Sequence, residues 1–162
     1  MKNIFDDPFF QQAFAELVGL LAAEFNGSPL IEFIDTFMYG FWGEGHTWPF
    51  ANNPFPDYQT GERTWIHMLE VQLEHFTKTP LLTNTQPDYS RVGNSELVDR
   101  TVRSNNWIRS DTIFIENEQI EALSNRPPWV AAVLEGPLPG KLSDASAAQE
   151  GISPAENRIA HV

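Results

Sequence analysis

Four short apolar runs alternate with amphipathic helical segments along this chain of 162 residues, and this order constrains the fold more than any other feature. Strands that alternate with helices are typical of βαβ units, because a parallel strand pair needs a long crossover connection. The apolar runs are continuous, which is typical of strands buried on both faces. The sequence therefore predicts an α/β fold built on a parallel sheet.

The boundaries of these elements follow from local signals. An aspartate, Asp7, precedes Pro8, which is the usual start of a helix, and the pair Asn26-Gly27 is a typical helix end. The expected strands span residues 30–40, 80–85, 107–113 and 129–136, with a loop rich in proline and asparagine over 49–58. After the first helix, further helices are expected over residues 62–77, 95–104 and 115–124, and near 143–149.

Two parallel architectures fit this order, the doubly wound sheet and the (β/α)8 barrel. A doubly wound sheet usually carries a glycine-rich phosphate turn after its first strand, and neither G-x-G-x-x-G nor a P-loop is present. Polar residues instead gather at the C-terminal ends of all four expected strands: Glu44, Asn84, Asp111 and Glu135. A barrel draws catalytic groups from several strand ends, so we expect a partial (β/α)8 barrel over residues 1–140. Residues 141–162 are expected to form a polar tail or the start of the next barrel unit.

Charge and composition exclude several function classes. The formal net charge of −12 argues against a nucleic-acid surface, which needs clustered lysine and arginine, and favours a neutral or cationic ligand. The chain has no cysteine, which excludes disulfides, thiolate metal sites and a cysteine nucleophile. We expect no membrane span and no signal peptide, because there is no long apolar run and no apolar segment near the N-terminus. The cellular compartment stays open.

Glu44 and Glu135 are the candidate catalytic residues. Each follows an apolar run and adjoins a glycine, and Glu44 lies in the aromatic stretch YGFWGEGHTWPF. A carboxyl group in an aromatic cleft is partly desolvated, which suits it to act as a general acid. Two carboxyl groups about 5–5.5 Å apart support retaining glycoside hydrolysis, and a gap of about 6.5–9.5 Å supports inversion. A salt-bridged or solvated glutamate is the structural alternative for each.

Aromatic and polar residues near these glutamates are candidates for substrate binding. Aromatic rings can stack on the apolar face of a sugar, and polar side chains can bind its hydroxyl groups. The alternative for the aromatic rings is packing in the core. The alternative for Arg109 and Asp111 is an ion pair with each other. The candidate binding residues are Tyr39, Trp42, His46, Trp48, Asn84, Arg109 and Asp111.

Other chemistries find little support in the sequence. His67 and His75 are eight positions apart without an H-E-x-x-H motif, so no metal site is expected. No serine lies in a G-x-S-x-G elbow, which argues against a serine hydrolase. No cofactor is expected.

The run IDTFMYGFWGEGHT and the preceding segment DDPFF…LAAEFNGSP resemble bacterial glycoside-hydrolase-like (β/α)8 proteins, such as β-galactosidase-like barrels and neighbouring uncharacterised families. In that retaining clan the acid/base glutamate follows strand 4 and the nucleophile follows strand 7, which the resemblance assigns to Glu44 and Glu135. The segment WIRSD, residues 107–111, is similar to strand 6. The clan usually has asparagine before the acid/base, where this chain has Gly43, so the hydroxyl-binding amide would come from elsewhere, with Asn84 as a candidate.

The resemblance spans roughly residues 5–136 and implies a carbohydrate substrate. Four strands cannot close a barrel of eight, so we expect a C-terminal-half fragment that is inactive alone, or one that pairs with the missing half of its barrel or with a second copy. Two alternatives remain: a non-catalytic carbohydrate-binding barrel, and another barrel enzyme, a lyase or isomerase, that uses Glu44 as a base.

Overall fold

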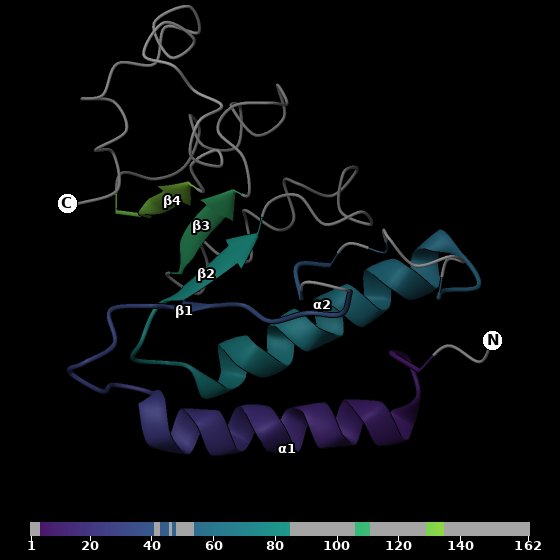
Figure 1. Ribbon diagram of the computed structural model, residues 1–162, viewed down its shortest axis with the longest axis horizontal. Coiled ribbons are helices and arrows are strands. Elements are labelled where there is room, and N and C mark those ends of the chain that lie inside the picture. The colour runs from purple at the N-terminus through teal and green to yellow at the C-terminus, as the bar shows by residue number, and fades with distance from the viewer. Residues whose placement is uncertain are drawn as a thin grey trace, which may run out of the picture.

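A parallel sheet with two helices on one side forms the part of the chain that the computed structural model describes, residues 4–40, 43–45, 47, 54–84, 106–110 and 129–134 (Figure 1). The strands pair in the order β1-β2-β3-β4, and every pair is parallel. This confirms the α/β class. The elements are α1 (Pro8–Phe25), β1 (Ile34–Asp35), α2 (Tyr58–His75), β2 (Leu81–Asn84), β3 (Trp107–Ser110) and β4 (Ala132–Leu134).

Helix α1 has the boundaries that its local signals predict. The side chain of Asp7 accepts a hydrogen bond from the backbone N–H of Phe9 at 3.0 Å, and Pro8 occupies the first turn, where its missing N–H costs little. At the other end, Asn26 caps the helix and Gly27 has a φ of +90°, a conformation that favours glycine.

Helix α2 begins four residues before the predicted position of 62. Asp57 is its N-cap, and the Oδ1 atom of this residue accepts a hydrogen bond from the backbone N–H of Thr60 at 2.7 Å. The prediction was wrong because Asp57 lies in the segment whose prolines and asparagines indicated a loop. An aspartate cap is a stronger local signal than this composition, since it satisfies a helix N–H group directly.

The strands are shorter than the apolar runs that predicted them. β1 has only two residues, although pairing continues for one more position through a hydrogen bond from Thr36 N–H to Leu82 O at 2.9 Å. β4 starts at Ala132 rather than at 129, and Trp129 is 66% exposed. The predicted residues 85, 111–113 and 135–136 lie outside the described residues, as do the predicted helices 95–104, 115–124 and 143–149 and the segment 141–162.

The hydrophobic core lies between the two helices and the sheet. Apolar side chains from α1, from α2 and from the start of β2 bury one another there, which is the main favourable term in folding. Its members include Phe14, Val18, Trp65, Met68, Leu69 and Leu81, all of them buried. No helix among the described residues is long and apolar enough to cross a membrane.

The C-terminal ends of the two helices are tied together by Asn26. The Oδ1 atom of Asn26 accepts hydrogen bonds from the backbone N–H groups of Lys78 at 2.8 Å and Thr79 at 3.1 Å. Its Nδ2 atom donates to the backbone carbonyl of His75 at 3.0 Å. These bonds fix the segment that leads into β2, and they lie at the amino-terminal edge of the sheet.

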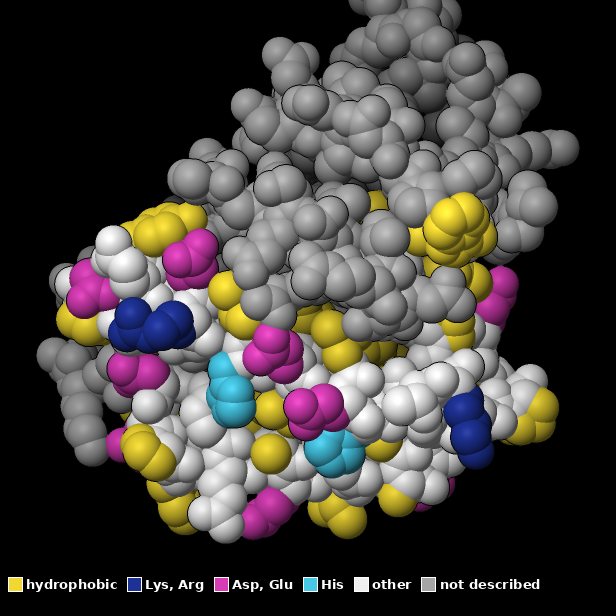
Figure 2. Space-filling model, turned by 180° about the vertical axis from the view of Figure 1, so that it is seen from behind, with side chains coloured by type: hydrophobic (Ala, Val, Ile, Leu, Met, Phe, Trp, Pro, Cys, Tyr) yellow, Lys and Arg dark blue, Asp and Glu magenta, His cyan; other side chains and the backbone are white. Residues whose placement is uncertain are grey.

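The surface of this helical half shows more acidic than basic side chains (Figure 2). In the view from behind, acidic side chains are spread over it and basic ones are few (Figure 2). The outward face of α1 also carries exposed apolar side chains, Phe9 at 80%, Leu17 at 48% and Leu20 at 71%. α1 is therefore apolar on most of its circumference, which is typical of a helix that packs on more than one side.

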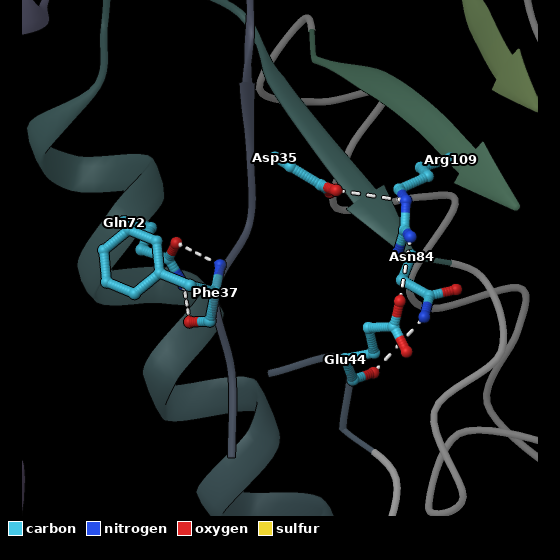
Figure 3. Close-up of polar contacts among 6 residues, drawn as sticks. All are labelled: Asp35, Phe37, Glu44, Gln72, Asn84 and Arg109. Atoms are coloured by element: carbon cyan, nitrogen blue, oxygen red, sulfur yellow. Dashed lines mark hydrogen bonds and ion pairs between the residues drawn. The ribbon is translucent and has the colours of Figure 1, made fainter. Parts of the chain in front are cut away.

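A buried glutamine continues the pairing of β1 after the strand ends. Gln72 is fully buried in α2, and its Oε1 atom accepts a hydrogen bond from Phe37 N–H while its Nε2 atom donates to Phe37 O, both at 3.0 Å (Figure 3). The amide thus satisfies both backbone groups of one residue, as a neighbouring strand would. Nε2 also donates to Met68 O at 3.1 Å.

We predict that Gln72→Leu lowers the free energy of unfolding by about 2–4 kcal/mol, because it leaves the N–H and C=O groups of Phe37 without these partners. Urea unfolding followed by tryptophan fluorescence measures this change. The matched control is Gln59→Leu in the same helix, where the side chain is exposed and the effect should stay within about 0.5 kcal/mol. Equal effects of the two substitutions would contradict a special role for Gln72.

The cap of α2 should make stability depend on pH. Side-chain and backbone hydrogen bonds from Thr60 hold the pKa of Asp57 below its ordinary value of 3.8. The cap therefore stabilises the fold fully above pH 3.8. This stabilisation is lost as the pH falls through the lower pKa that Asp57 has in the folded protein. Asp57→Ala should lower the unfolding free energy at neutral pH, and the difference from wild type should shrink in acid. Asp57→Asn keeps a capping oxygen that does not titrate, so it should be less harmful than alanine at neutral pH.

Candidate functional site

Polar side chains gather on the sheet face that points away from the helices. Ile34 and Leu81 are paired in register and pack with the helices, so the next positions, Asp35 and Leu82, lie on the opposite face. Asn84 follows Leu82 by two residues and is paired in register with Arg109. Asp35, Asn84 and Arg109 therefore share one face near the carboxyl ends of three neighbouring strands.

Arg109 joins the members of this cluster (Figure 3). Its Nε atom lies 3.0 Å from Asp35 Oδ2, and its Nη2 atom lies 2.8 Å from Glu44 Oε1. The side chain of Arg109 is only 14% exposed, against 48% for Asp35 and 24% for Glu44. A largely buried guanidinium needs such partners, because an unpaired charge out of water is costly.

The loop after β1 brings Glu44 to Arg109. Two backbone hydrogen bonds close this loop, from Met38 N–H to Gly43 O at 2.7 Å and from Gly45 N–H to Tyr39 O at 2.9 Å. Gly43 and Gly45, on either side of Glu44, have φ values of +80° and +88°. Side chains other than glycine adopt such values at a cost, so the two glycines of the G-E-G triplet permit the turn that presents the carboxylate.

Asn84 supports the same loop from β2. Its Nδ2 atom donates to the backbone carbonyl of Glu44 at 3.3 Å, and its side chain is 1% exposed. Glu44 is thus held at two points, the carbonyl by Asn84 and Oε1 by Arg109. Its second oxygen, Oε2, accepts no hydrogen bond from any residue that the structure describes.

The structure brings together three of the predicted site residues, Glu44, Asn84 and Arg109. Tyr39 lies elsewhere: its side chain is 1% exposed, and its ring packs against Phe5 and Phe55 in the core. Core packing was the alternative expected for the aromatic residues, and the structure shows it for Tyr39. The remaining predicted site residues, Trp42, His46, Trp48, Asp111 and Glu135, lie outside the described residues.

The sequence prediction missed Asp35, which belongs to the site, and Gln72, which holds the chain that leads to the Glu44 loop. Asp35 was placed in the first strand but not in the site, although a charge inside an otherwise apolar strand was a usable signal. Gln72 gave no such signal, because its contact with Phe37 spans 35 positions of the sequence. Arg109 was predicted to bind hydroxyl groups or to pair with Asp111. Among the described residues, it pairs with Asp35 and Glu44.

The charged side chains that the structure describes in this cluster are two carboxylates and one guanidinium. Asp35 and Glu44 each contribute −1 and Arg109 contributes +1, so these three side chains carry −1 in their ionised forms. Histidine, aspartate and glutamate side chains form no group of three that could hold a metal ion among the described residues. The described side chains of the cluster offer hydrogen-bonding carboxylates around a guanidinium. No family model, curated protein or solved structure matches this chain.

We predict that Gly45→Ala destabilises the fold by about 1–2 kcal/mol, because the position is buried and its φ is +88°. The matched control is Gly19→Ala in α1. A methyl group at position 19 would lie 3.6 Å from His75 Nε2, an ordinary contact, and alanine favours a helix over glycine by up to about 1 kcal/mol. The two variants should therefore shift the urea midpoint in opposite directions. A stabilising Gly45→Ala would contradict the strain at this turn.

Proposed function

We propose that the described sheet is part of a (β/α)8 barrel of the glycoside-hydrolase-like kind. The strand order supports this, because each strand pairs with the next one in the sequence and all are parallel. In a barrel every strand neighbours the next, whereas a doubly wound sheet reverses its order at a switch point. Both described helices also lie on one side of the sheet (Figure 1).

The location of the polar cluster supports the same architecture. In a barrel the face opposite the helices points inward, and active sites lie at the carboxyl ends of the strands. Asp35 and Asn84 are the last residues of β1 and β2, and Arg109 is next to last in β3. The exposed apolar face of α1 agrees with a helix that has further neighbours, as helices have between successive βα units.

We propose further that this site binds a carbohydrate and cleaves its glycosidic bond. The observation that carries the proposal is the position of Glu44 at the carboxyl edge of the sheet, where its carboxylate bonds to Arg109 near the end of β3. β4, the neighbour of β3, ends at this edge at Leu134, directly before Glu135 in the sequence. Both glutamates therefore follow strands that end at one edge of a parallel sheet.

In the proposed reaction, Glu44 protonates the glycosidic oxygen and later activates water, and Glu135 attacks the anomeric carbon. A retaining reaction requires the two carboxyl groups about 5–5.5 Å apart. Asn84 holds the Glu44 carbonyl and so fixes the acid/base loop rather than a sugar hydroxyl. Trp42, His46 and Trp48 are proposed to contact the sugar ring, on the strength of their positions beside Glu44.

A second candidate function is carbohydrate binding without hydrolysis. The ion pair of Glu44 with Arg109, at 2.8 Å, favours it, because a proton-donating carboxyl group would have to give up this partner. In that case the carboxylates would only accept hydrogen bonds from sugar hydroxyls. The two functions share the site and differ in the need for Glu135.

We predict that the chain binds neutral sugars, as detected by saturation-transfer NMR, and that Glu44→Gln weakens binding while the exposed Glu74→Gln does not. Hydrolysis of a panel of nitrophenyl glycosides by the protein separates the two functions. For a glycosidase, Glu44→Gln and Glu135→Gln should each lower kcat by roughly 10²–10⁴-fold. Sugar binding without turnover, unaffected by Glu135→Gln, indicates the binding protein. Absence of sugar binding contradicts both proposed functions, hydrolysis and binding without hydrolysis.

A further inference from the structure

The end of α1 carries an asparagine-glycine pair, Asn26-Gly27. This dipeptide is chemically labile in a flexible chain, because glycine has no Cβ to keep its backbone nitrogen away from the asparagine side chain. A bond forms between that nitrogen and Cγ of asparagine, the bond from Cγ to Nδ2 breaks, and ammonia leaves with the amide proton. Water then opens the resulting succinimide ring to aspartate or isoaspartate. The pair is therefore a position where a chain can modify itself without an enzyme.

The nucleophile of this reaction is held by another bond in the fold. The backbone N–H of Gly27 donates to Thr79 Oγ1 at 2.7 Å. The same hydroxyl donates to Phe25 O at 3.1 Å, and Thr79 is 3% exposed. A buried hydroxyl that both accepts and donates is held in place by its partners. The nitrogen of Gly27 is thus directed toward the segment before β2 and not toward the side chain of Asn26.

The electrophile, the side-chain amide of Asn26, is held as well. Its Oδ1 atom accepts from the backbone N–H groups of Lys78 and Thr79, at 2.8 and 3.1 Å. Its Nδ2 atom donates to His75 O at 3.0 Å and to Thr77 Oγ1 at 3.4 Å. Ring closure requires the amide to turn toward Gly27, which breaks these bonds. The fold therefore opposes the reaction at both reacting groups.

The products of deamidation cannot restore the same contact. In aspartate an oxygen replaces Nδ2, so two acceptors face each other at His75 O and no proton lies between them. Isoaspartate in addition lengthens the backbone directly before Gly27, which has a φ of +90°. A hydrogen bond that is replaced by two facing acceptors costs more than its own contribution, because both oxygens remain unsatisfied.

We propose that Asn26-Gly27 is a self-modification site that the fold keeps closed. Local opening of the contact between Asn26 and residues 75–79 permits an irreversible deamidation, and the product holds α1 to the end of α2 less firmly. The rate of modification then follows the fraction of molecules in which this contact is open. The contact lies at the amino-terminal edge of the sheet, opposite to Glu44 and Arg109, so the inference does not depend on the proposed function.

The test follows the whole chain in buffer, with peptide mapping by mass spectrometry to assign each deamidated asparagine. Modification of Asn26 should be at least about tenfold slower in the folded protein than in a synthetic peptide of residues 24–30, where nothing holds the two groups. Thr79→Val removes the acceptor for Gly27 N–H and should raise the rate about three- to tenfold. The matched control is Thr77→Val, at an exposed position with a longer contact, which should leave the rate near that of wild type.

A second substitution separates local opening from global unfolding. Gln72→Leu destabilises the fold through the contact of Gln72 with Phe37, away from Asn26, so it should raise the rate less than Thr79→Val does. An equal acceleration in these two variants would overturn the local opening. Equal rates in Thr79→Val and Thr77→Val would overturn the role of Thr79, and equal rates in the folded protein and the peptide would overturn the protection itself.

Asn26→Asp reproduces one product directly and needs no incubation. It should lower the urea midpoint of unfolding, because the carboxylate faces the carbonyl of His75. Gln59→Glu is the control: it makes the same change from amide to carboxylate at an exposed position in the first turn of α2, where a negative charge is tolerated. An Asn26→Asp protein that unfolds at the same urea concentration as wild type would overturn the proposed weakening.

Discussion

The buried amide of Gln72 is the interaction on which the site geometry depends. β1 pairs with β2 for only a few positions, and a parallel strand that leaves its sheet exposes backbone groups that must be satisfied. Gln72 supplies a donor and an acceptor to Phe37 from within α2 and so fixes the chain one residue before Met38, where the Glu44 loop closes. One fully buried side chain of α2 therefore holds the chain between the end of β1 and the Glu44 loop.

Arg109 makes the second long-range connection. Its two ion pairs join the end of β1, the loop after β1 and the body of β3. These elements are separate in the sequence but lie together because parallel strands end at the same edge of a sheet. Partial burial strengthens the electrostatic attraction of such a pair and also makes the loss of a partner more costly. The arginine thus orders the loop whose backbone would otherwise be held mainly by its own turn.

Local signals in the sequence predicted those features that depend on neighbours in the chain. The cap at Asp7, the helix end at Asn26-Gly27 and the glycines around Glu44 each act within a few residues, and the structure contains them all. The position of Glu44, Asn84 and Arg109 at one edge was also predictable, because it follows from parallel strands alone. The sequence did not predict the roles of Gln72 and Asp35, and it predicted Tyr39 in the site although its ring packs in the core. In all three cases the environment depends on contacts between segments that are distant in the sequence.

The ion pairs of Arg109 alone would suit a purely structural role, since many such clusters serve only to neutralise a buried charge. The partial exposure of the Asp35 and Glu44 carboxylates argues for a further role. A structural cluster gains most when its charges are all shielded and its oxygens are all used. In this site the guanidinium is the shielded member, the carboxylates remain partly exposed, and Oε2 of Glu44 has no partner among the described residues. The arrangement therefore buries the cation and leaves hydrogen-bond acceptors toward solvent, which agrees with the proposed binding of a ligand rich in hydroxyl groups.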